Sequence, residues 1–269
     1  LVWAGLWFLA FILAGCSQKE TALVVTEVNP TQTITPILTL SPSPTRATEN
    51  PATATPTQDK TPPKFPVFSL CSPLEEHDLS SLPGIVSSPY DPPPAAKDDR
   101  HQGVDFAYFN QGGRKSIDGE GVRAILPGRV AARVEDRLPY GNMILLETPG
   151  AYLPAEVISG LGMGSGESVY HLYAHLLTGP TPDLGDWVAC GSPLGQVGAS
   201  GYNIPVAHLH LETRIGPAGT QFGVMAYYDT LAAAEEMANY ELWRMSPIVR
   251  HFDPMRLFQA DGFHPEMDE

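Results

Sequence analysis

The sequence has few cysteines and few positive charges, and both shortages limit what the chain can be. Only three of its 269 residues are cysteine, at positions 16, 71 and 190. Structural zinc sites usually take several cysteine ligands, so a metal site here has to use other side chains. Lys and Arg together number 16 against 30 Asp and Glu, which gives a formal net charge of −14. That charge repels nucleic acid and excludes it as a partner.

The sequence also lacks a hydrophobic run long enough to span a bilayer, which takes about 20 apolar residues. Residues 1–15, LVWAGLWFLAFILAG, form a shorter run that is typical of the apolar part of an export signal. Residues 13–16, LAGC, resemble a bacterial lipobox, which predicts cleavage before Cys16 and lipid attachment to its thiol. A plain signal or an anchor with a chance cysteine is the alternative. We therefore expect an extracytoplasmic protein, lipid-anchored to a bacterial membrane of the cell envelope.

Cys71 and Cys190 then remain in an oxidising compartment, where two thiols can pair. The sequence leaves open whether they form a disulfide or whether Cys190 is a buried free thiol.

The chain divides by composition into a tether and a folded domain. Residues 16–66 are rich in Thr, Pro and Ser and have too little apolar surface to offset the entropy of ordering. We expect an extended, disordered tether there. The folded domain is predicted over residues 67–258, and the polar residues 259–269 are predicted to be a flexible tail.

The domain is predicted to be mainly β. Short alternating apolar stretches separated by Gly and Pro recur near residues 129–134, 143–147, 168–176 and 206–214. One late helix is expected over residues 229–243, with Asp229 as its N-cap and apolar residues at helical spacing.

Three short motifs hold five of the eight histidines: HQGVDFAY from residue 101, HLYAHL from residue 171 and AHLHLE from residue 207. Because side chains at i and i+2 on a strand share a face, His208, His210 and Glu212 are expected to project together. Leu209 and Leu211 then face the core. The third motif therefore predicts one polar wall of a groove.

The same parity applied to the second motif puts His171, Tyr173 and His175 on one face of their strand. For one isolated histidine, a hydrogen-bonded structural role would be the better interpretation. Two alternating arrays in one domain favour a second polar wall facing the first.

Imidazole and carboxylate side chains in such motifs suit zinc, which takes nitrogen and oxygen ligands. A catalytic zinc keeps three protein ligands and leaves the fourth position open. His101 and Asp105 supply two ligands, and one histidine of the HLH pair supplies the third. The surplus imidazoles are then free for acid–base work or for stabilising an oxyanion.

With these motifs, the chain resembles the lysostaphin/LytM-type zinc endopeptidases, which cut peptides in bacterial peptidoglycan. The resemblance covers roughly residues 87–214 and includes, in the order of that family, SSPY, HQGVDFAY, GVRAILPGRV, YGNMILLE, HLYAHL, GDWVACGSPLGQVGASG and AHLHLE. It implies an antiparallel β-sheet core with an open groove, built on a duplicated hybrid motif, plus the one C-terminal helix. It also implies a monomer that binds Zn²⁺ and peptidoglycan peptides.

By that likeness, His101, Asp105 and His210 are the zinc ligands, and His175 and His208 are the catalytic histidines. The implied reaction is zinc-assisted hydrolysis of a peptide bond. One of the two catalytic histidines accepts a proton from water and the other hydrogen-bonds the tetrahedral oxyanion. Which histidine has which role stays open.

Three further residues are candidates for the groove or for supporting the ligands. Tyr173 either assists the oxyanion or packs in the groove wall, and His171 lines the groove. Glu212 either orients a histidine or is one partner of a surface cross-strand pair.

The chain departs from the simplest family pattern in a Gly-rich loop at residues 149–167 and an extra stretch at residues 218–258. The loop is expected to edge the groove. The second stretch has no functional explanation from the sequence. One alternative is an inactive homologue that binds the wall and activates other wall hydrolases, and the five intact positions argue against it. Another is a zinc peptidase that acts on a non-wall protein or peptide, which the motifs do not exclude. The sequence does not reveal the bond cleaved or whether activity is regulated.

Overall fold

The computed structural model describes residues 68–94 and 96–258. The chain divides into two units after Thr55, and all described residues fall in the second. The export signal, Cys16, the tether and the C-terminal tail lie outside the described residues, so those expectations stay predictions. Within the described part, no helix is both long and apolar enough to cross a membrane.

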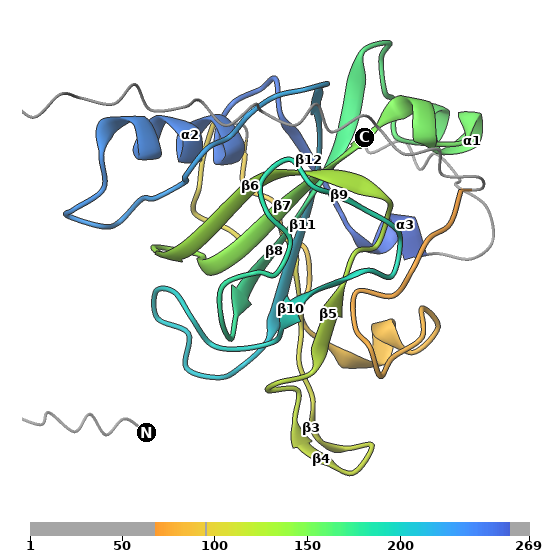
Figure 1. Ribbon diagram of the computed structural model, residues 1–269, viewed down its shortest axis with the longest axis vertical. Helices are drawn as coiled ribbons and strands as arrows, with labels where there is room; N and C mark the ends of the chain where they lie inside the picture. Colours follow the sequence, from red (N-terminus) through yellow and green to blue (C-terminus); the bar gives the residue numbers. More distant parts are fainter. Residues whose placement is uncertain (1–67, 95, 259–269) are drawn as a thin grey trace, which may run out of the picture. The chain divides into compact units, whose positions relative to one another are not determined.

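The fold is mainly β, as the sequence predicts (Figure 1). The described residues form twelve strands and three α-helices. The strands are β1 (Val86–Ser88), β2 (Val104–Phe106), β3 (Phe109–Gln111), β4 (Arg114–Ser116), β5 (Gly121–Arg123), β6 (Gly128–Arg137), β7 (Gly141–Pro149), β8 (Glu167–Leu176), β9 (Trp187–Val188), β10 (Pro193–Gln196), β11 (Leu209–Pro217) and β12 (Arg250–Phe252). The helices are α1 (Ala155–Gly160), α2 (Ala234–Arg244) and α3 (Met255–Phe258).

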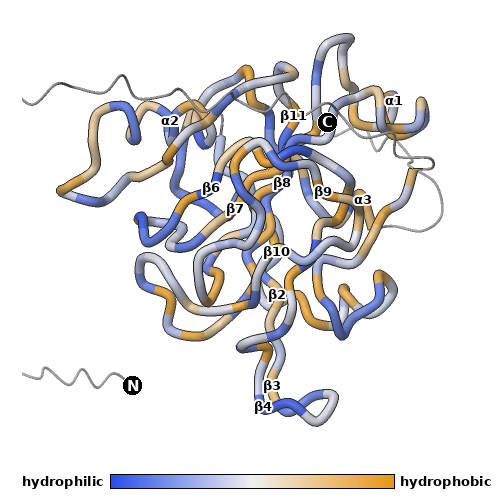
Figure 2. Tube along the Cα trace, viewed as in Figure 1, coloured by the Kyte–Doolittle hydropathy of each residue, from blue (hydrophilic) through white to orange (hydrophobic). Residues whose placement is uncertain are grey.

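Eight strands form one antiparallel sheet in the order β1-β2-β11-β8-β7-β6-β9, with β12 paired to β11. Two smaller pairs, β5–β10 and β3–β4, complete the set. The long strands β6, β7, β8 and β11 contain the alternating stretches that the sequence marks, except that residues 206–208 of the last stretch precede β11. Their apolar residues gather at the middle of the sheet (Figure 2).

Both faces of this sheet are buried. One face carries the larger hydrophobic core, against which α1 and α3 pack through Val157, Leu161, Leu257 and Phe258. The other face carries a second core that includes Leu145 and Leu172 and is covered by residues 222–249. We expected one face to be open and polar, and that expectation is wrong for β8. Its residues are almost all buried, as in strands covered on both sides.

Residues 222–249 of the extra stretch 218–258 cover the second face. Phe222, Tyr240 and Trp243 of this stretch pack against the sheet, and Trp243 is fully buried. Helix α2 lies over this face, whereas α1 and α3 belong to the other (Figure 1). The stretch is therefore part of the fold.

The late helix begins later than predicted. Its N-cap is Ala233, whose backbone N–H donates to the Glu236 side chain 2.8 Å away. Asp229, the predicted N-cap, instead accepts the backbone N–H of Leu231 in the preceding turn. An aspartate that closes its own local turn competes with helix formation, which explains the shift.

Cys71 and Cys190 form a disulfide that joins the first described residues, before β1, to the turn between β9 and β10. The Gly-rich loop at residues 149–167 contains α1 and lines a separate cavity of about 650 Å³ that includes Ala218. It contributes no residue to the histidine groove described below. The expectation that this loop edges the groove is therefore wrong.

Candidate metal centre and its groove

Three side chains predicted as metal ligands meet at one point. Asp105 Oδ1 lies 3.0 Å from His101 Nε2 and 2.7 Å from His210 Nδ1, and the two nitrogens are 3.1 Å apart. Tetrahedral ligands about 2.0–2.1 Å from zinc lie roughly 3.3 Å from one another. The three atoms are close to that separation, and two imidazoles with one carboxylate match the donors that zinc prefers. The residues therefore fit a zinc ion with one position left for another ligand.

Pairing between β2 and β11 creates this cluster. Asp105 on β2 is directly opposite His210 on β11, so the two side chains share a face of the sheet. His101 lies just before β2 and bridges to Asp91. Gly103 permits the close approach, because a Cβ there would lie 2.6 Å from the Leu211 carbonyl oxygen and 2.9 Å from the His210 ring. The glycine of the His-x-Gly-x-Asp motif is thus required sterically.

His101 and His210 each have one ring nitrogen that faces away from the cluster, and that nitrogen is hydrogen-bonded. His101 Nδ1 donates to the Pro89 carbonyl oxygen at 2.8 Å, which leaves Nε2 to face the cluster. His210 Nε2 donates to Glu212 Oε1 at 3.0 Å, which directs Nδ1 to the cluster. Such partners fix the ring orientation and the tautomer of metal-binding histidines.

The pKa values of Asp105 and His210 are shifted far from their ordinary values. Burial alone would raise the pKa of Asp105, but hydrogen bonds from His101 and His210 and their charges hold that pKa well below its ordinary value. Burial would lower the pKa of His210, but hydrogen bonds to Asp105 and Glu212 outweigh it and raise the pKa to about 9. Without a metal, the His210 ring is therefore an imidazolium between two carboxylates.

The two predicted catalytic histidines lie beside this cluster. The rings of His175 and His208 are 4.8 Å apart between centroids, and His175 is 5.6 Å from His210. His175 Nδ1 donates to the Ser200 carbonyl oxygen at 2.8 Å, and His208 Nδ1 donates to that of Val206 at 3.0 Å. When such a ring is neutral, Nε2 carries the lone pair. Burial, followed by the charges of His210 and His208, lowers the pKa of His175 to about 3 and keeps its ring neutral.

His175 reaches the site by leaving the regular strand pattern. Its φ of +61° is left-handed, and the β7–β8 register shifts at the adjacent pair Asn142/Ile144. Such an irregularity re-aims a side chain. Gly141, with φ +69°, lies against Ser200, and a Cβ there would be 2.4 Å from the Ser200 backbone. This contact holds the carbonyl that orients His175.

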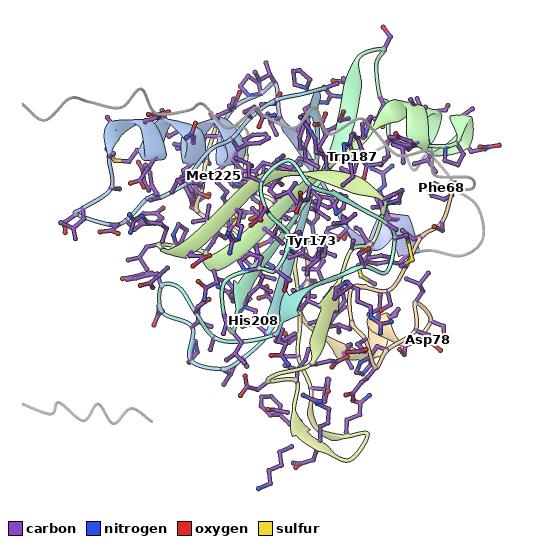
Figure 3. All side chains as sticks on the ribbon, viewed as in Figure 1. Phe68, Asp78, Tyr173, Trp187, His208 and Met225 are labelled. Atoms are coloured by element: carbon purple, nitrogen blue, oxygen red, sulfur yellow. A yellow bond between two sulfur atoms is a disulfide. The ribbon has the colours of Figure 1, made fainter. Side chains whose placement is uncertain are left out.

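His171 and Tyr173 do not line the groove, and their predicted placement is wrong. Both are fully buried in β8, and their cross-strand partners on β11, Leu211 and Thr213, place them on the face opposite His210. Figure 3 shows Tyr173 near the centre of the fold, apart from His208. Tyr173 accepts the backbone N–H of Ile125 and its hydroxyl donates to His171 Nδ1, 2.8 Å away. His171 Nε2 donates to Thr148, whose hydroxyl donates to the Pro127 carbonyl oxygen. These hydrogen bonds satisfy both side chains within the core. Strand parity grouped His171 and Tyr173 with His175 because it did not allow for the backbone irregularity at His175.

Glu212 is fully buried and is not a surface residue. Its Oε1 accepts hydrogen bonds from His210 Nε2, from the Tyr140 hydroxyl at 2.7 Å and from Arg244 Nη1 at 2.7 Å. Its Oε2 accepts from Arg214 at 2.8 Å and from the Trp243 indole at 2.9 Å. Burial would raise the pKa of Glu212, but the two arginines and His210 hold it well below the ordinary value.

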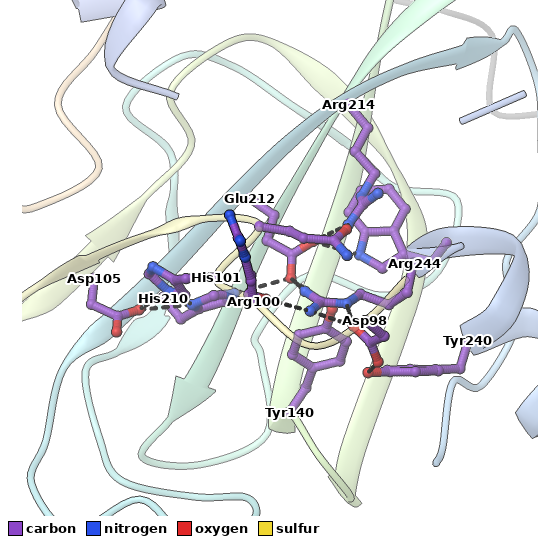
Figure 4. Close-up of polar contacts among 12 residues, drawn as sticks. Asp98, Arg100, His101, Asp105, Tyr140, His210, Glu212, Arg214, Tyr240 and Arg244 are labelled. Atoms are coloured by element: carbon purple, nitrogen blue, oxygen red, sulfur yellow. Dashed lines mark hydrogen bonds and ion pairs between the residues drawn. The ribbon is translucent and has the colours of Figure 1, made fainter. Parts of the chain in front are cut away.

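The three candidate ligands and the two predicted catalytic histidines border a groove of about 380 Å³. Its other lining residues come from three places: Pro139 and Tyr140, the segment 202–205, and a group formed by Asp98, Tyr228, Tyr240 and Arg244. The sequence analysis missed Asp98, Tyr140 and Arg244. Asp98 and Arg244 lie outside any recognisable motif, and Tyr140 stands in YGNMILLE without a partner visible in the sequence. Figure 4 shows how their contacts connect to the His–Asp–His cluster.

No protein-family model matches the sequence, and no curated protein matches it. Several solved structures are similar to it. A variant catalytic domain of the prophage-encoded M23 protein EnpA from Enterococcus faecalis is 22% identical over 51% of this chain and 85% of that one, with a TM-score of 0.35. The catalytic domain of the antimicrobial peptidase lysostaphin from Staphylococcus simulans is 26% identical over 52% and 87%, with a TM-score of 0.33. A zinc-containing peptidase from Vibrio cholerae is 20% identical over 55% and 36%, with a TM-score of 0.33. At these TM-scores, the case for a function comes from the site itself.

Proposed function

We propose that this chain is a zinc endopeptidase of the lysostaphin/LytM type that hydrolyses peptide bonds in peptidoglycan. The observation that carries the proposal is one arrangement of five side chains. His101, Asp105 and His210 bring three ligand atoms together at separations that suit zinc. His175 and His208 stand next to them, each anchored through Nδ1.

In the proposed reaction, bound zinc supplies polarisation of the scissile carbonyl and a lowered pKa for the attacking water. The histidines handle the protons. One of His175 and His208 accepts the proton of the water at Nε2 and returns it to the leaving amine. The other is placed to hydrogen-bond the tetrahedral oxyanion through Nε2 once that nitrogen holds a proton taken from solvent. Both rings are held in the same manner, so either one meets the geometric requirement for the base.

The substrate class rests on the motifs that the chain shares with the lysostaphin/LytM family. A groove lined by Tyr202 and Tyr228 beside the cluster suits an extended peptide. The second candidate, an inactive homologue that activates other wall hydrolases, needs no metal centre. The complete set of ligands and anchored histidines favours the enzyme.

We also propose that the domain works outside the cytoplasm. The disulfide between Cys71 and Cys190 supports this location, because disulfides persist in oxidising compartments. Attachment through a lipid on Cys16 remains part of the proposal, and replacing Cys16 by Ser tests it. Release of the variant from membranes is expected, and unchanged retention would reject lipidation.

Paired variants of the HLH motif test the proposed division of labour. His210→Ala should lose both zinc and cleavage of purified cell walls, because it removes a ligand. His208→Ala should keep zinc and lose on the order of 10²–10⁴-fold in turnover, because it removes a proton carrier. His77→Gln is the matched control, since His77 hydrogen-bonds Glu120 away from the groove. Equal loss of zinc in the His208 and His210 variants would show that the two roles are assigned wrongly.

A further inference from the structure

Arg244, the last residue of α2, connects the extra C-terminal stretch to the surroundings of two ligands, His210 and His101. Its Nη1 donates to Glu212 Oε1 at 2.7 Å, the same oxygen that His210 Nε2 reaches. Its Nε donates to Asp98 Oδ1, and its Nη2 donates to the Arg100 carbonyl oxygen at 3.3 Å. Asp98 and Arg100 lie directly before His101 in the chain. One guanidinium therefore joins the support of one ligand to the backbone that carries the other (Figure 4).

These contacts are sheltered from solvent, so they are stronger than a surface ion pair. The side chains of Arg244 and Asp98 are each 10% exposed, and that of Glu212 is fully buried. Tyr240, also on α2, donates its hydroxyl to Asp98 Oδ2 at 2.6 Å. The planar fork of an arginine can meet Glu212, Asp98 and a carbonyl together, which a lysine ammonium on a flexible stem cannot do in the same geometry.

The other arginine at Glu212 takes a different position. Arg214 reaches Glu212 Oε2 and Gln102, and its guanidinium lies over the Trp243 ring, 4.5 Å from the centroid. Its Nε and Nη1 have no hydrogen-bond partner among the residues that the structure describes. Arg214 thus balances the charge of the carboxylate from the far side. Arg244 alone of the two binds the oxygen shared with His210.

We propose that Arg244 is a positioning residue for the metal centre. It holds Glu212 and the segment 98–100 so that His210 Nδ1 and His101 Nε2 face Asp105 before the metal arrives. Preorganised ligands avoid the cost of ordering them when the ion binds. The inference rests on the proposed function, because it takes these three residues as zinc ligands. It assigns a role in the site to the stretch 218–258, which lies outside the motifs that resemble the peptidase family.

The test compares the zinc affinity of full-length variants by competition with a chelator. Arg244→Lys keeps the positive charge and loses the fork, so zinc binding should weaken by roughly 10–100-fold, the effect typical of residues that support metal ligands. Arg250→Lys is the matched control. Arg250 also makes a two-pronged contact, to Glu167 at 2.8 and 3.1 Å, but it lies on β12 and does not touch the cluster. The zinc affinity of Arg250→Lys should match that of wild type, because Arg250 supports none of the ligands.

A folded Arg244→Lys protein that binds zinc as tightly as wild type would overturn the inference, since it would lack the weakening expected of a supporting residue. Folding is checked by near-ultraviolet circular dichroism of the metal-free protein. If Arg244→Lys does not fold, Asp98→Asn decides, because it keeps the contact between Arg244 and Glu212 and weakens the contacts that Arg244 and Tyr240 make with the segment before His101. A several-fold weaker zinc affinity supports the proposal, and an unchanged affinity refutes it. Tight zinc binding by wild type without wall cleavage would refute the proposed endopeptidase function. The comparison of zinc affinities would still test the role of Arg244.

Discussion

Zinc binding should expel a proton from His210, and the pH dependence of the affinity should reveal it. In the metal-free protein both ring nitrogens lie within hydrogen-bonding distance of carboxylates, Nδ1 of Asp105 and Nε2 of Glu212. These contacts raise the pKa of His210 to about 9 against the opposing effect of burial. A metal needs the lone pair on Nδ1, so the proton there has to leave. Asp105 contributes no proton near neutral pH, because its pKa is held below its ordinary value.

The magnitude follows from that pKa. Between pH 7 and 8.5 the His210 ring is mostly protonated, so each unit of pH should tighten zinc binding about tenfold, or about 1.4 kcal/mol. His210 should release about one proton per zinc at pH 7. Glu212→Gln removes one of the two carboxylates and lowers the pKa of His210. The variant should therefore release fewer protons and show a flatter pH dependence.

The assay is isothermal titration calorimetry of the metal-free protein in buffers with different ionisation enthalpies, which counts protons per zinc. Other groups also release protons, so the difference between wild type and Glu212→Gln isolates His210. Equal proton release by the two proteins, with affinities that have the same pH dependence, would refute the reasoning. It would show that the His210 ring is not held as an imidazolium between Asp105 and Glu212.

Two further predictions concern stability. Reducing the Cys71–Cys190 disulfide, whose cysteines are 119 residues apart, should lower the free energy of unfolding by roughly 2–5 kcal/mol; an unchanged melting temperature in protein with two titratable thiols would contradict this. Burial lowers the pKa of His171 to about 3, so the unfolded chain binds a proton below pH 6.5 that the folded protein refuses. The free energy of unfolding should therefore decrease as the pH is lowered from 6.5 to 3, by about 1.4 kcal/mol per pH unit for this residue. In urea titrations at several pH values, His171→Gln should remove that part of the slope. Identical slopes would rule out a neutral, buried His171.

The sequence contained enough to bring the five central residues together. His-x-Gly-x-Asp and His-x-His are local patterns, and antiparallel pairing of β2 with β11 places Asp105 opposite His210. The parity of β11 was read correctly, because that strand is regular from Leu209 onward. The mainly β fold followed from alternation in the long strands.

The errors in placing the site residues have two physical sources, long-range packing that buries both faces of the sheet and an irregularity in β8. Strand parity grouped His171 and Tyr173 with His175, but the left-handed backbone at His175 breaks the period of two. The two buried residues satisfy each other by hydrogen bonds, so their polarity did not mark a groove. Arg244 was missed because its contacts depend on how α2 folds back on the sheet. Neither long-range packing nor a strand irregularity has a local signal in the sequence.

The most direct test of the central claim is the digestion of purified cell walls by the full chain, first stripped of metal and then supplied with one equivalent of Zn²⁺. Products are read by mass spectrometry, with free amino groups counted at peptide cross-links. The account predicts one zinc bound per chain and new amino groups that appear only after zinc is restored. Full zinc occupancy with no cleavage of walls or of peptides derived from them would contradict it.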